Sequence, residues 1–453
     1  MATAPPFELK LLQRDWIEGV PGHVLGDLVE SYIDQIRTAG EDASTRGVML
    51  VETDPLRFAA VYFAAVYLHV PVILANPNWR HIEWQAVEQL VNPAMIFGPA
   101  PFTEGPRRGI RHPPVGTILI PTGGSSSGVK FAMHQWHTLA AACQGFQAWF
   151  GAKPVTAYCM LPLFHVSGLM QLMRSCLSGG QIVFPSVQAL QAGHYPRLAG
   201  GWRCLSLVPT QLQRFITQGS IVTWLTTMQA ILIGGAAMPE ALAQQARALQ
   251  LPLTLSYGMT ETAAMVTALP PDQFLAGQCN AGRPLPHVQI ELIRKDGSMC
   301  AVGETGRIRI HSASMFKGYH TGSPSASPVG YVSGDEGYWD TAGCLHIVGR
   351  SDRLIISGGE KIDPHEVERA IIHTGLVRQV LVLGWPDSEW GQRIVALYIP
   401  DQRGRHKSDL KAALQADLAN HKIPKQMIEV SQLPLNEHGK VDHERLQQLI
   451  QYS

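Results

Sequence analysis

Apolar runs of three or four residues recur along the first 290 residues, separated by segments long enough to form helices. The runs span residues 49–51, 72–74, 117–120, 230–233 and 253–256. Residues 211–219 and 241–249 are expected to be helices. Buried strands joined by helices have this pattern. The chain is therefore expected to be an α/β protein with a large N-terminal domain of wound α/β sheets.

The pattern changes from about residue 289 onward. Three β-rich pieces joined by Gly-containing turns predict a small β-subdomain, at residues 289–293, 307–311 and 344–348. After Arg350 the expected elements are a helix at 364–372, strands at 377–383 and 394–399, and a helix at 407–419. Because 453 residues exceed what one hydrophobic core usually holds, we predict two domains. They are residues 1–349 and a small, mobile α+β domain, residues 350–453.

The composition is that of an ordinary globular protein. The chain has 36 basic and 36 acidic residues, with 45% hydrophobic and 16% charged residues. This balance implies neither an acidic tail nor an overall basic footprint for nucleic acid, although local charged patches remain possible. A small-molecule enzyme without nucleic-acid partners is the simplest expectation.

The seven cysteines are scattered, and none is spaced as CxxC. This favours a reducing compartment over a disulfide framework or a zinc site. No basic segment followed by an apolar stretch opens the chain, so a cytoplasmic protein is expected. Residues 58–79 lack Asp, Glu, Lys and Arg, but Pro71 divides them into a helix (55–68) and a β-rich run (70–75). They are expected to be buried core, without stable membrane insertion.

Residues 121–130, Pro-Thr-Gly-Gly-Ser-Ser-Ser-Gly-Val-Lys, follow an apolar strand and precede a helix-like stretch. Small residues, three hydroxyls and Lys130 together suit an anion nest. A Walker loop does not fit, since the lysine comes one residue late and Phe131 follows it. Taken alone, such a turn is more often a flexible loop.

Two further segments carry candidate nucleotide-binding groups. In residues 256–262, Tyr257 can stack on a base, Gly258 allows a tight turn, and Thr260 and Glu261 offer a hydroxyl and a carboxylate for phosphate and Mg²⁺. A helix cap is the alternative interpretation. In residues 333–337, Asp335 could bind ribose hydroxyls, although a surface turn explains that segment equally well.

The order and spacing of these segments resemble the superfamily of adenylate-forming enzymes, which includes acyl-CoA synthetases, peptide-synthetase adenylation domains and firefly luciferase. Further matching segments are residues 161–168, 234–237, 303–306, 349–353, 356–362 and 433–440. The resemblance runs from about residue 47 to the end. Residues 122–136 are similar to one branch, the 2-succinylbenzoate CoA ligases of menaquinone and phylloquinone synthesis.

This resemblance implies a site for ATP. The β- and γ-phosphates would be held by Thr122, Ser125, Ser126, Ser127 and Lys130. Adenine and ribose would be bound by Gly235, Ala236, Tyr257, Gly258, Asp335 and Arg350. Thr260 would contact the α-phosphate, and Glu261 would bind Mg²⁺. Lys440 would bridge the attacking carboxylate and ATP.

The resemblance also implies two half-reactions, adenylation with pyrophosphate release and then thioester formation with AMP release. The C-terminal domain would rotate about a hinge at Asp352 between them. Ser357, Gly358, Gly359 and Trp390 would then contact CoA, although core packing suits the tryptophan equally well. The acid pocket would use His165, also a candidate catalytic group, with Ser167 and Thr210.

The phosphate loop departs from the family pattern at Gly123, Ser127, Val129 and Phe131. The expected function is that of an ATP- and Mg²⁺-dependent 2-succinylbenzoate CoA ligase, an acid-thiol ligase with CoA as co-substrate. The alternatives are a ligase for another aromatic or medium-chain acid, a domain that loads a separate carrier protein, and a non-catalytic nucleotide-binding relative. The sequence predicts no oligomeric state.

Overall fold

The computed structural model describes most of the chain in thirteen segments. They are residues 4–79, 81–101, 110–124, 128–151, 154–196, 200–320, 330–350, 355–357, 360–387, 390–401, 407–418, 422–436 and 441–451. The chain forms two compact units. The first comprises residues 1–290 and 310–331, and the second comprises residues 291–309 and 332–453. The predicted boundary near residue 350 stays a prediction.

The first unit begins with a five-stranded sheet in the order β3-β1-β2-β4-β5. Its strands are β1 (Val48–Leu50), β2 (Val72–Leu74), β3 (Met95–Phe97), β4 (Thr117–Gly124) and β5 (Gly128–Gln135). The first four are parallel, and β5 runs antiparallel to β4. The short helical turn η1 (Leu9–Leu11) precedes the sheet's helices, which are α1 (Gly22–Thr38), α2 (Gly40–Arg46), α3 (Pro55–Tyr67) and α4 (His81–Leu90).

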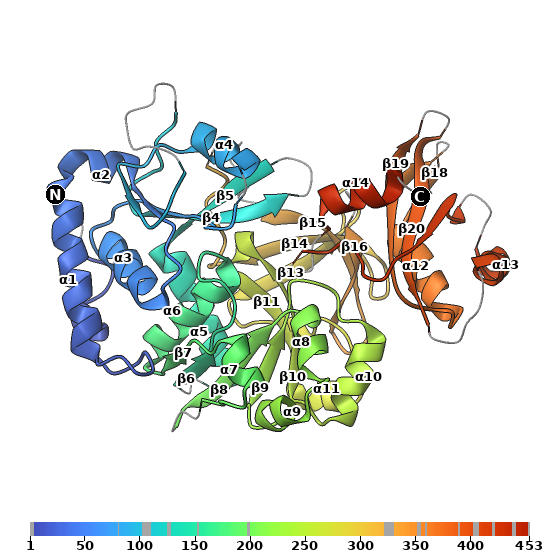
Figure 1. The fold of residues 1–453 in the computed structure, drawn as a ribbon, viewed down its shortest axis with the longest axis horizontal. Helices are drawn as coiled ribbons and strands as arrows, with labels where there is room; N and C mark the ends of the chain where they lie inside the picture. The colour runs from blue at the N-terminus through green and yellow to red at the C-terminus, as the bar shows by residue number, and fades with distance from the viewer. Residues whose placement is uncertain are drawn as a thin grey trace. The chain divides into compact units, whose positions relative to one another are not determined.

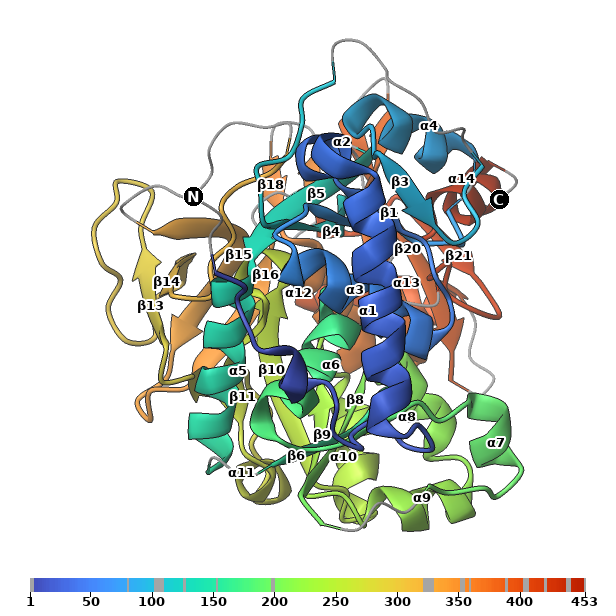
Figure 2. The same ribbon diagram turned by 90° about the vertical axis from the view of Figure 1, so that its left-hand side faces the viewer.

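Helix α3 shows why the uncharged segment is core. Asp54 caps its first turn by accepting a hydrogen bond from the Arg57 amide at 2.8 Å, and Pro55 occupies the first helical position. Residues 58–66 are all buried, and α1 lies alongside the helix (Figure 2). The prediction of a helix broken before a β-run is confirmed.

A seven-stranded sheet follows in the order β12-β11-β10-β9-β8-β6-β7. Its strands are β6 (Val155–Tyr158), β7 (Ile182–Val183), β8 (Trp202–Leu207), β9 (Ala230–Ile233), β10 (Leu253–Met259), β11 (Ala264–Leu269) and β12 (Arg283–Pro284). Strands β6 to β10 are parallel, and β11 pairs antiparallel with β10 and β12. Helices α5 (Trp136–Phe150) and α6 (Val166–Ser178) share a buried core with α3 and with strands of both sheets (Figure 1).

The remaining helices of this unit are α7 (Val187–Gln191), α8 (Pro209–Phe215), α9 (Gly219–Leu225), α10 (Glu240–Ala248) and α11 (Pro271–Leu275). Two short helices thus replace the single helix expected at residues 211–219. Gln218 has an extended backbone, and the Thr217 hydroxyl donates back to the Arg214 carbonyl at 2.8 Å. These local bonds end α8 before Gly219 begins α9.

The second unit contains most of a four-stranded sheet in the order β13-β14-β15-β16. These strands are β13 (Val288–Ile293), β14 (Gly306–Ser312), β15 (Tyr331–Trp339) and β16 (Leu345–Arg350). They correspond to the predicted β-subdomain.

A second sheet of this unit has the order β18-β17-β20-β19, with β21 paired to β20. Its strands are β17 (Ile355–Ser357), β18 (Glu360–Ile362), β19 (Val377–Asp387), β20 (Gly391–Pro400) and β21 (Gln426–Glu429). Its helices are α12 (Pro364–His373), α13 (Lys407–Asp417) and α14 (His443–Gln451). Val367, Ile394 and Leu414 are among its fully buried core residues.

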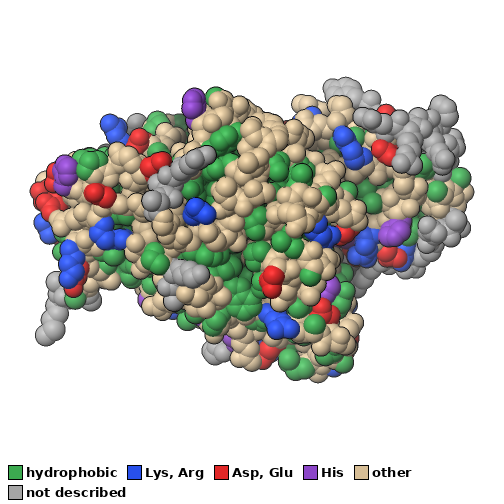
Figure 3. Space-filling model, turned by 90° about the horizontal axis from the view of Figure 1, so that it is seen from below, with side chains coloured by type: hydrophobic (Ala, Val, Ile, Leu, Met, Phe, Trp, Pro, Cys, Tyr) green, Lys and Arg blue, Asp and Glu red, His purple; other side chains and the backbone are tan. Residues whose placement is uncertain are grey.

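The predicted fold class, wound α/β sheets with a β-subdomain and a smaller α+β part, is confirmed. All seven cysteines are free. Acidic and basic side chains are interspersed on the face that Figure 3 presents. None of the helices in the described ranges has the length and hydropathy needed to cross a membrane.

Candidate active site

The predicted phosphate loop lies in the hairpin formed by β4 and β5. Thr122 pairs directly with Lys130 across the hairpin, so their side chains lie on the same face of the sheet. Ser125, Ser126 and Ser127 lie outside the described residues.

The residues after this loop form strand β5 instead of the expected helix-like stretch. Besides β4, the strand bonds to residues far along the chain. The Met133 amide donates to the Gly318 carbonyl at 2.9 Å, and the His320 amide donates to the Phe131 carbonyl at 3.0 Å. Pairing with β4 carries the strand as far as Gln135, and these distant partners, which no local pattern reveals, bond its other edge.

In the turn that carries Thr260 and Glu261, every backbone carbonyl has a hydrogen-bond partner. His134 Nε2 lies 2.7 Å from the Thr260 carbonyl, the Phe316 amide donates to the Glu261 carbonyl at 2.8 Å, and the Ser314 hydroxyl donates to the Thr262 carbonyl at 3.0 Å. We call the short helical turn η2 (Thr260–Thr262) with these partners the Glu261 turn. Its backbone is thus fixed from two sides before any substrate binds.

His134, the β5 residue that contacts this turn, is neutral. Burial lowers the pKa of His134 to about 4, and a carbonyl can only accept, so Nε2 carries the proton. Its Nδ1 lies 3.0 Å from the Thr138 hydroxyl. His134 therefore links β5 to the Glu261 turn as a hydrogen-bond donor at neutral pH.

Glu261 is 7% exposed, and Oε1 of its carboxylate accepts a hydrogen bond from the Tyr319 hydroxyl at 2.6 Å. Burial and then the charge of Glu261 raise the pKa of Tyr319 well above its usual value, so the phenol remains a donor. No described residue donates a hydrogen bond to the other oxygen, Oε2. Mg²⁺ commonly binds one or two carboxylates together with phosphate oxygens and water, so this carboxylate suits Mg²⁺ bound with ATP. The described residues contain no cluster of three His, Cys, Asp or Glu able to hold a metal by themselves.

The adenine-side residues meet at one edge of the seven-stranded sheet. Strands β9 and β10 are parallel neighbours, so their carboxyl ends lie together, where α/β proteins bind nucleotides. Gly235 and Ala236 follow β9, whereas Tyr257 and Gly258 end β10. A Cβ at Gly258 would lie 1.9 Å from the Ala264 carbonyl oxygen, so only glycine fits.

The candidate acid-binding residues lie after neighbouring strands of the same sheet. Strands β6 and β8 are parallel to each other and to β9, and His165 and Thr210 follow them. His165 is the residue before α6, and Thr210 is in the first turn of α8. Topology therefore directs these residues to the sheet edge that bears Tyr257.

Arg174 is a residue that the sequence analysis missed. It is 4% exposed on α6, its guanidinium carbon lies 4.1 Å from the centre of the Phe146 ring, and no acidic side chain of the described chain pairs with it. Burial lowers its pKa, and its Nε has no hydrogen-bond partner. The sequence signal was an arginine inside an apolar segment without Asp or Glu.

Other unpaired polar atoms accompany this arginine. Gln171 Oε1, Ser175 Oγ and both ring nitrogens of His287 are buried without hydrogen-bond partners. Burial, and secondly the charge of Arg174, lowers the pKa of His287 to about 4. We call Gln171, Arg174, Ser175 and His287 the Arg174 cluster. A buried cation without an anion costs free energy, so the cluster suits an anionic ligand.

In the second unit, Asp335 pairs with Arg350 between β15 and β16, which brings the two predicted ribose contacts together. The Arg350 side chain, Asp352, Gly358, Gly359 and Lys440 lie outside the described residues. Ser357 pairs with Gly391, the residue after Trp390, so two predicted CoA contacts are close.

Trp390 is not core. Its side chain is 38% exposed, and Lys425 Nζ lies 4.6 Å from the centre of its ring. An exposed indole with a neighbouring ammonium suits an adenine that carries phosphate.

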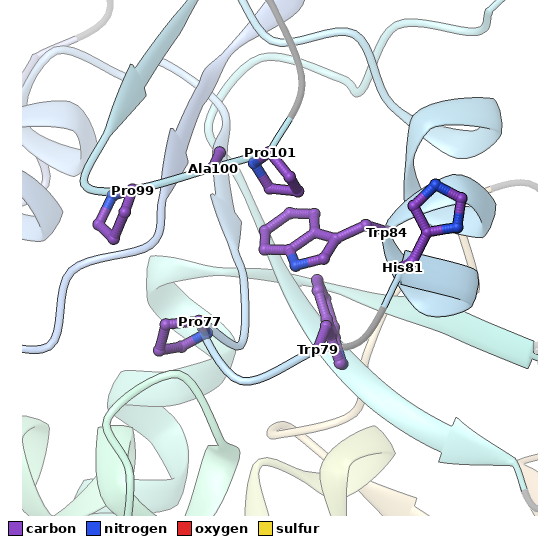
Figure 4. Close-up of a pocket in the computed structure, with 7 residues that line it drawn as sticks. All are labelled: Pro77, Trp79, His81, Trp84, Pro99, Ala100 and Pro101. Atoms are coloured by element: carbon purple, nitrogen blue, oxygen red, sulfur yellow. The ribbon is translucent and has the colours of Figure 1, made fainter.

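One cavity is lined by none of these residues. It has a volume of about 450 Å³ and is lined by Pro77, Trp79, His81, Trp84, Pro99, Ala100 and Pro101 (Figure 4). The Trp79 and Trp84 rings meet edge to face with centres 5.2 Å apart. None of its lining residues was predicted from the sequence.

Comparisons with known proteins identify the family. Residues 111–320 match the AMP-binding enzyme family model, and residues 366–440 match the AMP-binding enzyme C-terminal domain. A 2-succinylbenzoate CoA ligase of Geobacillus sp. (strain WCH70) is 32% identical over 351 residues, which are 74% of this chain and 69% of that protein. One from Oceanobacillus iheyensis is 31% identical over 285 residues, covering 62% of this chain and 58% of the relative.

Solved structures share the fold. The o-succinylbenzoate CoA synthetase (MenE) of Bacillus subtilis, in complex with its acyl-adenylate intermediate, superposes with a TM-score of 0.79 at 22% identity, covering 98% of each chain. ATP-bound MatB of Rhodopseudomonas palustris superposes with a TM-score of 0.79 at 20% identity, covering 98% of this chain and 99% of that one. The resemblance inferred from the sequence is confirmed, and the chain belongs to the family of AMP-binding, adenylate-forming enzymes that includes the 2-succinylbenzoate CoA ligases.

Proposed function

We propose that this protein is an ATP-dependent 2-succinylbenzoate CoA ligase. In the first step a carboxylate oxygen of the acid attacks the α-phosphorus of ATP, and the bond to pyrophosphate breaks. In the second, the CoA sulfur attacks the acyl carbonyl, the thiol proton is released, and AMP leaves. Relatives that carry this name, at 30–33% identity, support the substrate.

The observation that carries the substrate class is the buried Arg174, whose Nε has no hydrogen-bond partner and which no acidic side chain of the described residues pairs with. A diacid keeps one carboxylate that does not react, and this charge needs a cation in a site that excludes water. A guanidinium binds a carboxylate through paired, charge-assisted hydrogen bonds. Ser167, Gln171 and Arg174 are spaced i, i+4 and i+7, so one face of α6 presents all three.

In the adenylation step the chain would neutralise phosphate charge. Thr122, Lys130 and Ser125 to Ser127 would bind the β- and γ-phosphates, and Thr260 the α-phosphate. Mg²⁺ bound with ATP would supply charge neutralisation, held by Glu261. Lys440 would stabilise the negative charge that develops at the α-phosphorus.

Thioester formation needs a different environment. We propose that residues 350–453 rotate about Asp352, which withdraws Lys440 and brings Ser357, Gly358 and Gly359 to the adenylate. Trp390, with its exposed ring, would stack on the CoA adenine. Free cysteines agree with the cytoplasm, the compartment we propose.

The substrate test measures pyrophosphate release and CoA-thioester formation with ATP, Mg²⁺ and CoA. The acids are 2-succinylbenzoate, benzoate, octanoate and 3-benzoylpropionate, which lacks the aromatic carboxylate. We expect product with 2-succinylbenzoate and little with the rest. Thioester formed only from a monoacid would retain the mechanism and reject the diacid, and pyrophosphate release without thioester would indicate a carrier protein as acceptor. No pyrophosphate release with any acid would reject the proposal.

A second test separates the half-reactions. Lys440→Ala should slow adenylation by roughly 10²- to 10³-fold, the scale for loss of one group that stabilises developing charge. Thioester formation from preformed 2-succinylbenzoyl-adenylate should change far less. Equal loss in both steps would contradict domain rotation.

A further inference from the structure

The Glu261 turn holds a backbone that the local sequence does not favour. Ala263 and Ala264 follow it with φ of +53° and +75°, and left-handed residues other than glycine cost of order 1 kcal/mol or more each. Such a conformation persists only when its surroundings fix it. Residues 314–319 supply much of this support, through the Ser314 hydroxyl, the Phe316 amide and the Tyr319 hydroxyl.

These three contacts are not equivalent. Ser314 and Phe316 bond backbone carbonyls, so they fix the path of the turn. The Tyr319 hydroxyl donates to the Glu261 carboxylate itself, at 2.6 Å, and no other described residue donates a hydrogen bond to that carboxylate. It therefore determines which carboxylate oxygen remains for another ligand.

Tyr319 also lies against the phosphate hairpin. Its backbone forms a bridge with Ala132 on β5, two residues from Lys130. Lys130 Nζ lies 5.8 Å from the centre of the Tyr319 ring, a cation–π distance. One side chain thus contacts both a candidate metal ligand and a candidate phosphate-binding cation, from a segment that carried no predicted site residue.

We propose that Tyr319 is a positioning residue for the Mg²⁺·ATP complex, which directs Oε2 of Glu261 toward the cation and orients the Lys130 ammonium. This inference rests on the proposed function. Its physical basis is preorganisation: a carboxylate held by a charge-assisted hydrogen bond does not have to be ordered when the metal binds.

The test uses the full chain, Mg²⁺ and α,β-methylene-ATP, with no acid or CoA present. Isothermal titration calorimetry measures analogue binding at a series of Mg²⁺ concentrations. Tyr319→Phe keeps the ring and removes the hydroxyl. We expect the Mg²⁺ concentration for half-maximal enhancement to rise about 10-fold or more, as for loss of a hydrogen bond to a charged group, while binding without Mg²⁺ changes little.

Two further variants separate positioning from general damage. Tyr67→Phe removes a hydroxyl from a partly buried tyrosine of α3 and should leave the Mg²⁺ dependence unchanged. In a Glu261→Gln background, Tyr319→Phe should have little additional effect, because its action on Mg²⁺ passes through the carboxylate. Equal effects of Tyr319→Phe in both backgrounds would overturn the inference.

Should Tyr319→Phe fail to fold, Tyr331→Phe provides the same measurement. Tyr331 contributes to the raised pKa of Tyr319, after burial and Glu261, so its side chain lies close enough to influence that hydroxyl. Loss of the Tyr331 hydroxyl should raise the Mg²⁺ requirement about twofold. An unchanged requirement in that variant would count against the inference.

Failure of this inference and failure of the proposed function give different results. Mg²⁺-dependent analogue binding that Tyr319→Phe does not alter overturns the inference alone. Wild-type protein that binds no analogue at any Mg²⁺ concentration overturns both. A product other than 2-succinylbenzoyl-CoA in the substrate test leaves the inference intact.

Discussion

The Glu261 turn and the Arg174 cluster are both buried polar clusters of the same unit, but their hydrogen bonds differ. In the turn, the carbonyls of Thr260, Glu261 and Thr262 and the carboxylate all have partners. In the cluster, Arg174 Nε, Ser175 Oγ and both His287 nitrogens have none. A satisfied cluster fixes geometry before binding, whereas an unsatisfied one costs stability until a ligand completes it.

The largest effect is expected from Arg174→Met, which keeps the length and removes the charge. Loss of a buried charge pair with the substrate should lower kcat/KM for 2-succinylbenzoate by roughly 100-fold or more. The ligand-free variant should be as stable as the wild type or more so, because the uncompensated buried charge is gone. Steady-state kinetics and denaturant unfolding measure the two effects.

The matched control is 3-benzoylpropionate, which lacks the aromatic carboxylate. The same substitution should change its kcat/KM far less. A clear loss of stability in the ligand-free variant would mean that Arg174 stabilises the fold without a ligand. The Arg174 cluster would then be satisfied before binding, like the Glu261 turn.

The next effect concerns pH and two histidines, the buried His134 and the half-buried His287. The pKa of His134 is about 4 when folded, against an ordinary value of 6.5. As the pH falls, the unfolded chain binds this proton before the folded protein does. The contribution of neutral His134 to the free energy of unfolding is therefore complete above pH 6.5 and is lost between pH 6.5 and 4. It amounts to about 3 kcal/mol.

In both His134→Gln and His287→Gln, the free energy of unfolding should fall less than in the wild type as the pH is lowered. At pH 7.5 only His134→Gln should destabilise the protein, because only His134 has a backbone acceptor. Chemical unfolding between pH 4 and 7.5 checks this. Equal destabilisation of both variants at pH 7.5 would show that His287 is also satisfied.

The smallest effect compares two buried serines. Ser314→Ala leaves the Thr262 carbonyl without its donor and should cost about 1–2 kcal/mol. Ser175→Ala removes a hydroxyl that has no partner and should be neutral or stabilising. Thermal unfolding of the two variants gives the comparison directly, and a larger loss for Ser175→Ala would contradict it.

Much of the fold and the family was predictable from the sequence because the signals are local. Short apolar runs separated by helix-length segments predicted the wound α/β sheets. The order of short motifs indicated the adenylate-forming family. The predicted residues that follow parallel strands, such as Gly235 and Tyr257, do lie at one sheet edge. Their roles in binding stay predictions, as do those of Asp352 and Lys440.

The sequence by itself determined which chemical groups are present: a Gly- and Ser-rich loop with Lys130, a Thr-Glu pair after a strand, and an arginine in an apolar segment. Only the tertiary structure decided their partners. His134 meets the Thr260 carbonyl across 126 residues, and Tyr319 meets Glu261 across 58. Hydrogen bonds between distant segments depend on how sheets and loops pack, and no local pattern encodes them. For the same reason only the fold showed that Glu261 is held by a tyrosine, while Arg174 is buried with no acidic side chain of the described residues beside it.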